Sequence, residues 1–248
     1  MEYNPFSLSG KKILVTGASS GIGLAIAREC AKMGASLIIC GRNEKRTFAA
    51  LDELDGYGHE AVLGDLTDDR VLKDLLSKLP KLDGIVLSAG IVEMWPTLFA
   101  TREKFDKIFN TNFFAPIELI RMIVKKKLYN TNMSIVAIDS VAGNSDFCPA
   151  NSIYGSGKAA LRSFLKFFAL ENANKGIRVN SVSPGMILTP LHTDGTVEAE
   201  KLQETIEKVP LRRWGTPQEV AHSCVFLLSD ASSYITGTNI VIDGGYTI

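Results

Sequence analysis

The sequence predicts an α/β fold, a doubly wound parallel sheet of about seven strands with helices on both faces. Short β-branched runs alternate with longer helical patterns along the chain, as in successive right-handed βαβ units. Most of the short runs lack the polar alternation of a half-exposed strand, which indicates parallel strands covered on both faces. A glycine-rich turn after the first run fits the same class.

The expected elements follow from these patterns. The β-branched runs predict strands at residues 11–16, 36–40, 60–65, 84–89, 133–138, 178–183 and 239–243. Helical patterns fill the gaps at residues 20–33, 43–54, 67–79, 101–127, 154–174, 196–208 and 217–229. Gly34 suits the end of the first helix, Asn43 and Thr67 suit the N-caps of the next two, and Pro80 stops the third. Because no linker or internal repeat is visible, we expect residues 1–248 to form a single domain.

Composition and charge argue against several classes of protein. The 27 basic residues balance the 27 acidic ones, whereas proteins that bind duplex nucleic acid usually have a basic excess. The longest apolar runs are about five residues, far shorter than a membrane span, and no secretory signal is readable. The cysteines have neither CxxC pairing nor metal-ligand spacing; they are Cys30, Cys40, Cys148 and Cys224. We therefore expect a cytoplasmic protein with reduced thiols, without a metal site, a nucleic-acid partner or a membrane segment.

The glycine-rich turn has the sequence TGASSGIG, from Thr16 to Gly23, between the first strand and the first helix. Gly17 permits a tight turn off the strand, Gly21 lets backbone amides approach a pyrophosphate, and Gly23 lets the helix pack closely. Phosphates bound there would meet the positive end of the helix dipole. In this position the turn predicts a Rossmann-like dinucleotide site, although glycines alone would be weak evidence.

The end of the second expected strand bears on which dinucleotide is bound. An NAD site usually has an acidic residue there, which hydrogen-bonds the ribose 2′-hydroxyl. This chain has Gly41 followed by Arg42, and a guanidinium suits a 2′-phosphate. The sequence therefore favours NADP(H) over NAD(H), the alternative being that Arg42 is a solvated residue at the start of a helix. Asp65 ends the third strand and is expected at the adenine edge, or else serves as a turn carboxylate.

Three further residues form a candidate catalytic group. Tyr154 and Lys158 are four residues apart and share one face at the start of a helix. Such a pair arises easily by chance, but Ser140 follows the fifth strand at its carboxyl end, where open α/β sheets bind ligands. Asn112 falls within the long helix before that strand.

Over nearly its whole length the chain resembles the short-chain dehydrogenase/reductase family, in its compact single-domain branch. The matching motifs are TGASSGIG at 16–23, Asp65-Leu66-Thr67, Ala89-Gly90, Asn112, Ser140, Tyr154 with Lys158, NSVSPG at 180–185 running to Thr189, RWGTP at 213–217, FLLSD at 226–230, ITG at 235–237 and DGG at 243–245. The resemblance implies that Tyr154 is the acid/base, that Ser140 steadies the carbonyl and that Asn112 holds a water in the proton relay. It also implies that Lys158 binds the nicotinamide ribose, and we expect its ammonium to bring the Tyr154 pKa from about 10 toward neutrality.

The resemblance also implies a set of cofactor-binding residues. They are Gly17, Ser19, Ser20, Gly21, Ile22, Gly23, Arg42, Asp65, Leu66, Ser88, Ala89, Gly90, Tyr154, Lys158, Pro184, Gly185, Ile187 and Thr189. Two departures from the family pattern affect the site. Ser88 stands where the family usually has asparagine, and the interval from Ser140 to Tyr154 is one residue longer than the commonest family spacing.

Family resemblance places substrate recognition in the loops 91–100 and 144–153 and in the segment 186–212, which we expect to act as a lid. The candidate substrate residues are Ser140, Trp95, Phe147, Tyr154, Met186, Leu191 and His192. A lysine run at 125–127 and Lys175 resemble positions with which 3-oxoacyl-[acyl-carrier-protein] reductases hold their acidic partner, although such a run is more often a solvated helix end.

Three functions remain open at this point. One is an NADP(H)-dependent ketoreductase similar to the 3-oxoacyl-[acyl-carrier-protein] reductases, with a small carbonyl or alcohol substrate that is linked to a carrier protein. Another is a dehydrogenase of a different secondary alcohol, sugar or steroid. The third is a non-catalytic dinucleotide sensor, against which the intact Ser140, Tyr154 and Lys158 argue. The resemblance and the apolar segment 159–170 predict a homotetramer or homodimer.

Overall fold

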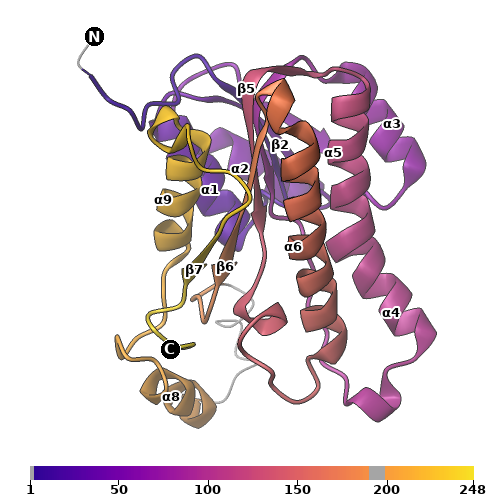
Figure 1. The fold of residues 1–248 in the computed structure, drawn as a ribbon, viewed down its shortest axis with the longest axis vertical. Helices are drawn as coiled ribbons and strands as arrows, with labels where there is room; N and C mark the ends of the chain where they lie inside the picture. The colour runs from indigo at the N-terminus through magenta and orange to yellow at the C-terminus, as the bar shows by residue number, and fades with distance from the viewer. Residues whose placement is uncertain (1–2, 190–198) are drawn as a thin grey trace.

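In the computed structural model, which describes residues 3–189 and 199–248, seven parallel strands form one sheet (Figure 1). The strand order is β3-β2-β1-β4-β5-β6-β7. The order therefore reverses beside β1, and the carboxyl ends of β1 and β4 flank the point at which open α/β sheets bind ligands. The predicted doubly wound, seven-stranded α/β class is confirmed.

The strands lie close to their predicted positions. Their bounds are β1 Lys12–Thr16, β2 Ser36–Gly41, β3 Glu60–Leu63, β4 Leu82–Leu87, β5 Tyr129–Ile138, β6 Arg178–Pro184 and β7 Asn239–Ile242. β5 starts earlier than predicted because Tyr129 pairs with Leu82 across an irregularity in register. β4 ends earlier than predicted because the amides of Ser88 and Ala89 turn to the Thr16 hydroxyl, at 3.1 and 3.2 Å.

The helices differ from prediction at two places. Their bounds are α1 Gly21–Lys32, α2 Glu44–Asp52, α3 Asp69–Lys78, α4 Arg102–Phe109, α5 Ala115–Lys125, α6 Ser152–Asn172, α8 Ala199–Glu207 and α9 Pro217–Leu228. The helix expected over 101–127 is divided between α4 and α5 by a π-helical turn, η2 (Asn110–Phe114). Asp68, not Thr67, caps α3, because the Thr67 amide and hydroxyl both bond the Asp65 carboxylate.

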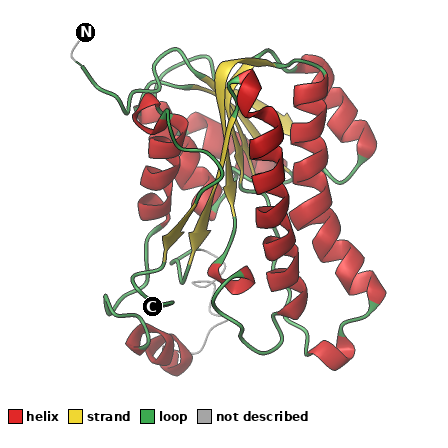
Figure 2. Ribbon diagram, in the orientation of Figure 1, coloured by secondary structure: helices red, strands yellow, loops and turns green. Residues whose placement is uncertain are grey.

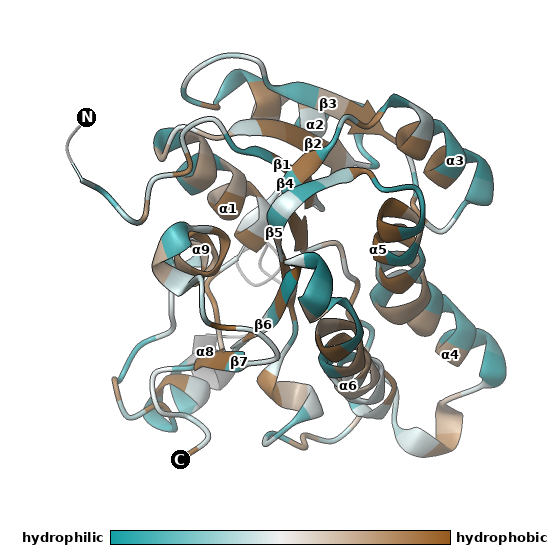
Figure 3. Cartoon of the chain, turned by 45° about the horizontal axis from the view of Figure 1, so that its top comes forward, coloured by the Kyte–Doolittle hydropathy of each residue, from teal (hydrophilic) through white to brown (hydrophobic). Residues whose placement is uncertain are grey.

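Helices cover both faces of the sheet (Figure 2). On one face α1, α2 and α9 pack over a buried cluster that includes Ile13 and Val15, and on the other α3, α5 and α6 pack over a cluster that includes Leu14. Figure 3 shows the apolar sides of these helices turned toward the strands. Successive residues of β1 thus enter opposite cores, which explains why the strands read as continuous apolar runs. Within the described residues, we find no helix with the length and apolar character that crossing a membrane requires.

Candidate active site

A cavity of about 670 Å³ runs along the carboxyl ends of the strands, from β2 past β1 and β4 to β5 and β6. Every residue that the sequence predicts to contact the cofactor lines this cavity. Ser140 lines it too, together with residues that the sequence analysis did not single out, among them Thr16, Arg46 and Asp139. The cavity therefore brings together the glycine turn, the adenine-side residues and the candidate catalytic group.

The glycine turn has the backbone geometry that a pyrophosphate requires. Gly17 has φ +68°, and a Cβ there would lie 2.7 Å from the Ala89 Cα. A Cβ on Gly23 would collide with the Gly17 carbonyl, so α1 can begin this close to the turn only with glycine. Ser20, the N-cap residue of α1, is extended and makes no side-chain cap bond, and the first turn holds no acidic residue. The helix N-terminus thus has the character of an anion site, and the residues present fit a dinucleotide.

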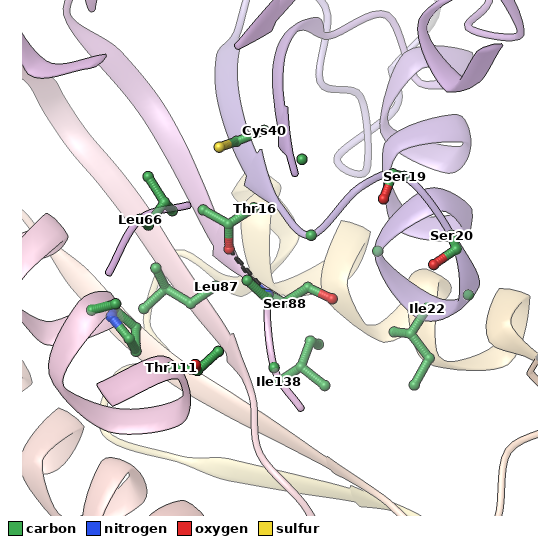
Figure 4. Close-up of a pocket in the computed structure, with 18 of the residues that line it drawn as sticks. Thr16, Ser19, Ser20, Ile22, Cys40, Leu66, Leu87, Ser88, Thr111 and Ile138 are labelled. Atoms are coloured by element: carbon green, nitrogen blue, oxygen red, sulfur yellow. Dashed lines mark hydrogen bonds between the residues drawn. The ribbon is translucent and has the colours of Figure 1, made fainter. Parts of the chain in front are cut away.

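Thr16 ties the two strands beside this turn together. Its hydroxyl donates to the Val86 carbonyl at 3.3 Å and accepts from the amides of Ser88 and Ala89 (Figure 4). The loop after β4 is therefore held against the glycine turn by a side chain of the turn's own motif. In the sequence, this role of Thr16 was indicated only by a single hydroxyl residue at the end of an apolar strand.

The adenine-side end of the cavity holds two arginines, Arg42 and Arg46. Nη1 of Arg42 donates to Asp65 Oδ2 at 3.2 Å. A Cβ added to Gly41 would collide with the Thr47 hydroxyl, which donates to the Asn43 carbonyl at 2.7 Å. A carboxylate at position 41, as an NAD site would have, therefore does not fit the present packing.

The candidate catalytic group assembles where β5 and α6 meet. Ser140 follows β5, while Tyr154 and Lys158 lie in the first turns of α6. The buried Lys158 donates from Nζ to the Ile138 carbonyl at 2.6 Å, and Nζ lies 5.8 Å from the centre of the Tyr154 ring. A side-chain hydrogen bond joins Ser140 and Tyr154. The three side chains face one cavity wall, as their spacing in the sequence suggested.

The electrostatics of this group differ from the expectation. Burial raises the pKa of Tyr154 to about 12, the Asp139 charge adds to the rise, and the hydrogen bond from Ser140 opposes it. Burial lowers the pKa of Lys158 to about 8, while Asp139 acts in the opposite direction. The expectation that Lys158 brings the Tyr154 pKa toward neutrality is therefore wrong when only the protein's own groups act on Tyr154. Desolvation, which the sequence alone does not reveal, is the largest influence on the pKa of each of the two side chains.

Asn112 lies in the π-helical turn η2 and does not line the cavity. Its buried side chain is engaged at both ends, since Nδ2 donates to the Ile91 carbonyl at 2.8 Å and Oδ1 accepts from the Ile91 amide at 2.9 Å. The side chain thus fixes the loop after β4. Because both ends of the side chain are already bonded, only the main-chain groups of Asn112 are left to hold a water in a proton relay.

The structure does not gather the predicted substrate residues as it gathers the cofactor residues. Trp95, Phe147 and Met186 lie outside the cavity. Phe147 is 82% exposed and lines a separate cavity of about 400 Å³ on the flank of α6. Leu191 and His192, with much of the segment expected to form a lid, lie outside the described residues. Among the residues that are described, we find no cluster of His, Cys, Asp or Glu side chains that could hold a metal ion.

Comparison with known proteins places the chain in a family. A family model described as enoyl-(acyl carrier protein) reductase matches residues 17–247. A 3-oxoacyl-[acyl-carrier-protein] reductase of Rickettsia conorii is 38% identical over 96% of this chain and 97% of its own length. A glucose 1-dehydrogenase of Gluconobacter oxydans is 32% identical over 97% of this chain and 93% of its own.

A crystal structure of a short-chain type dehydrogenase/reductase from Mycobacterium marinum is 35% identical, with a TM-score of 0.87 over 98% of each chain. The sequence matches and the fold thus agree with the glycine turn, the cavity and the Ser140–Tyr154–Lys158 group described above. The chain belongs to the short-chain dehydrogenase/reductase family, whose members are oxidoreductases that use NAD(P).

Proposed function

We propose that the protein is an NADP(H)-dependent ketoreductase that reduces a 3-oxoacyl thioester linked to an acyl carrier protein. The observation that supports the reaction most directly is the position of Ser140, Tyr154 and Lys158 on one wall of the nucleotide-sized cavity. The thioester substrate is supported by the similarity to the reductase of Rickettsia conorii, whose name states that activity.

In the proposed reaction the protein supplies the proton and the polar contacts. NADPH, when bound in the cavity, would supply a hydride to the carbonyl carbon. The Ser140 hydroxyl donates a hydrogen bond to the carbonyl oxygen as negative charge develops on it. Tyr154, whose pKa of about 12 keeps it protonated at neutral pH, gives its proton to that oxygen. The Lys158 ammonium then stabilises the phenolate.

The preference for NADP(H) is supported by the packing at the end of β2. Arg42 and Arg46 both line the adenine-side end of the cavity, where a 2′-phosphate would lie. The Thr47 hydroxyl occupies the space that an acidic side chain at position 41 would need. Both features disfavour recognition of a free ribose hydroxyl by a carboxylate.

The carrier-protein part of the proposal does not depend on the predicted lysines. Lys125 ends α5, Lys126 and Lys127 follow it just before β5 begins, and Lys175 comes just before β6 begins. They lie at the amino-terminal edge of the sheet, the upper end in Figure 1, whereas the cavity lies at the carboxyl ends of the strands. A carrier docked on these lysines would not face the cavity of the same chain.

A second candidate function is oxidation of a sugar, supported by the 32% identity to the glucose 1-dehydrogenase. A substrate panel separates the two. We expect acetoacetyl thioesters, on coenzyme A and on acyl carrier protein, to be reduced with NADPH and much more slowly with NADH, measured by nucleotide absorbance. Oxidation of glucose without thioester reduction would overturn the proposal in favour of the sugar. Tight nucleotide binding with no turnover of any substrate would indicate a sensor.

We also propose that the enzyme is a homotetramer or homodimer. Aromatic side chains form a row of partly or fully buried rings along α4, η2 and α6. Large apolar side chains of η2 and α6 remain exposed, namely Phe114, Phe167 and Leu170. An exposed apolar face of this kind is typical of a protein–protein interface.

A further inference from the structure

Asp139 is a buried carboxylate directly before Ser140, at the wall of the cavity. Its Oδ2 accepts from Arg162 Nη1 at 3.0 Å and from the Ser183 hydroxyl at 3.1 Å. Its Oδ1 is buried and, among the residues described, has no hydrogen-bond partner. Burial raises the pKa of Asp139, and the Lys158 and Arg162 cations oppose that rise. A buried carboxylate with an unpartnered oxygen is costly to the fold.

Arg162 extends the contact of Asp139 to the turn that holds Ser140. Its second terminal nitrogen, Nη2, donates to the Gly143 carbonyl at 2.7 Å. Gly143 ends the short 3₁₀ turn η3 (Val141–Gly143), and the Ser140 hydroxyl caps that turn by accepting from the Ala142 amide at 3.2 Å. One guanidinium therefore ties the end of β5 and the Ser140 turn to α6, the helix that also holds Tyr154 and Lys158.

The charge of Asp139 also acts on the two titratable groups of the candidate site. It raises the pKa of Tyr154, whose charged form is an anion, and it raises the pKa of Lys158, whose charged form is a cation. The groups that face Asp139 are Tyr154, Lys158 and Arg162 from α6, the Ser183 hydroxyl from β6 and the amide of Ser140. Because Oδ1 has no hydrogen-bond donor in the part of the chain that the structure describes, part of the negative charge stays unscreened inside the site.

We propose that Asp139 is a positioning residue that, through Arg162, holds the Ser140 turn against α6 and keeps a carboxylate beside the candidate catalytic group. This proposal rests on the proposed function of those residues as proton donor and supporting cation. Neither Asp139 nor Arg162 touches the reacting atoms in this scheme.

The charge part is tested with Asp139→Asn, which keeps the shape of the side chain and removes its charge. We expect both limbs of the pH profile for alcohol oxidation to move to lower pH by about one unit, since a nearby charge is lost. Both limbs move because the pKa of Tyr154 falls when a repelling anion is removed and the pKa of Lys158 falls when a supporting anion is removed. The two limbs report apparent pKa values of the coupled pair.

The part of the proposal in which Arg162 holds the Ser140 turn is tested with Arg162→Lys. This variant keeps the positive charge but has one side-chain nitrogen where Arg162 uses two. We expect kcat to fall several-fold while the pH profile and the Kd for NADPH stay unchanged. The control is Ser134→Ala, because Ser134 is buried in β5 and donates to the Leu227 carbonyl at 2.7 Å, away from the cavity. It should lower thermal stability without changing either kinetic readout.

Asp139→Asn leaves Arg162 without its anion. If the protein then fails to fold, the double variant D139N/R162Q, which removes both charges, should also move both limbs of the pH profile to lower pH. A folded Asp139→Asn or D139N/R162Q variant with an unmoved pH profile would overturn the proposal and leave Asp139 a structural residue. Failure of the proposed function itself would appear separately, as turnover that survives Tyr154→Phe in a protein with Asp139 intact.

Discussion

At the scale of single residues, the phenol of Tyr154 experiences opposing influences from the groups around it. Burial and the Asp139 charge raise its pKa to about 12, and the hydrogen bond from Ser140 lowers it. We expect Tyr154→Phe to reduce kcat by roughly 10²–10⁴-fold, the range for loss of a general acid, with NADPH affinity unchanged. Steady-state kinetics and a fluorescence titration with NADPH measure the two effects.

The matched control for that variant is Tyr129→Phe, since Tyr129 lies at the opposite end of β5 from the cavity. It should behave as wild type in both measurements. More than a tenth of wild-type turnover in Tyr154→Phe would mean that another group is the proton donor.

Arg42 gives a second prediction at this scale. Its guanidinium is paired with Asp65, so an aspartate at position 42 would face that carboxylate and is a poor test of cofactor choice. Arg42→Ala removes one cationic contact to the 2′-phosphate, and we expect the Kd for NADPH to rise about tenfold while that for NADH stays unchanged. Lys45→Ala is the control, because Lys45 lies three residues after Arg42, is exposed at the start of α2 and does not line the cavity. An equal loss for both nucleotides would contradict the assignment of Arg42 to the phosphate.

At the scale of elements, α9 begins with a complete capping box. The Thr216 hydroxyl accepts from the Glu219 amide at 3.3 Å, and the Glu219 carboxylate accepts from the Thr216 amide at 2.8 Å. We expect Thr216→Ala to lower the free energy of unfolding by about 1 kcal/mol, the usual effect of losing an N-cap side chain. Chemical denaturation followed by circular dichroism measures this. Gln218→Ala, in the same turn, should have no effect, and an equal loss in both variants would show that the cap contributes nothing.

The elements also show what the sequence could predict and what it could not. The central strands were predictable because they bury their residues in both cores, and the glycine turn because its close contacts exclude side chains. The π-helical turn was not, because it accompanies the pairing of Asn112 with Ile91, a contact between distant parts of the chain. For the same reason the burial that sets the Tyr154 pKa and the outward position of Phe147 left no signal in local spacing.

At the scale of the whole molecule, α6 still exposes large apolar side chains after the chain has folded. Leu161, Leu165 and Phe168 are buried against the sheet, whereas Phe167 is 64% exposed and Leu170 79% exposed. The ring of Phe164 lies 6.3 Å from that of Phe113 in η2, and Figure 3 shows α4, α5 and α6 side by side on this side of the molecule. A helix face that still exposes large apolar side chains gains free energy when a second copy covers it.

We therefore expect the double substitution of Phe167 and Leu170 by Glu to yield a folded monomer of 27.0 kDa, whereas the wild type has the mass of a dimer or tetramer. Size-exclusion chromatography with light scattering measures both masses. Tyr57→Glu is the control, since Tyr57 is 92% exposed on another part of the surface and its replacement should leave the mass unchanged. A wild-type protein of monomer mass at micromolar concentration would contradict the assembly, and a variant that stayed oligomeric would place the interface on another face.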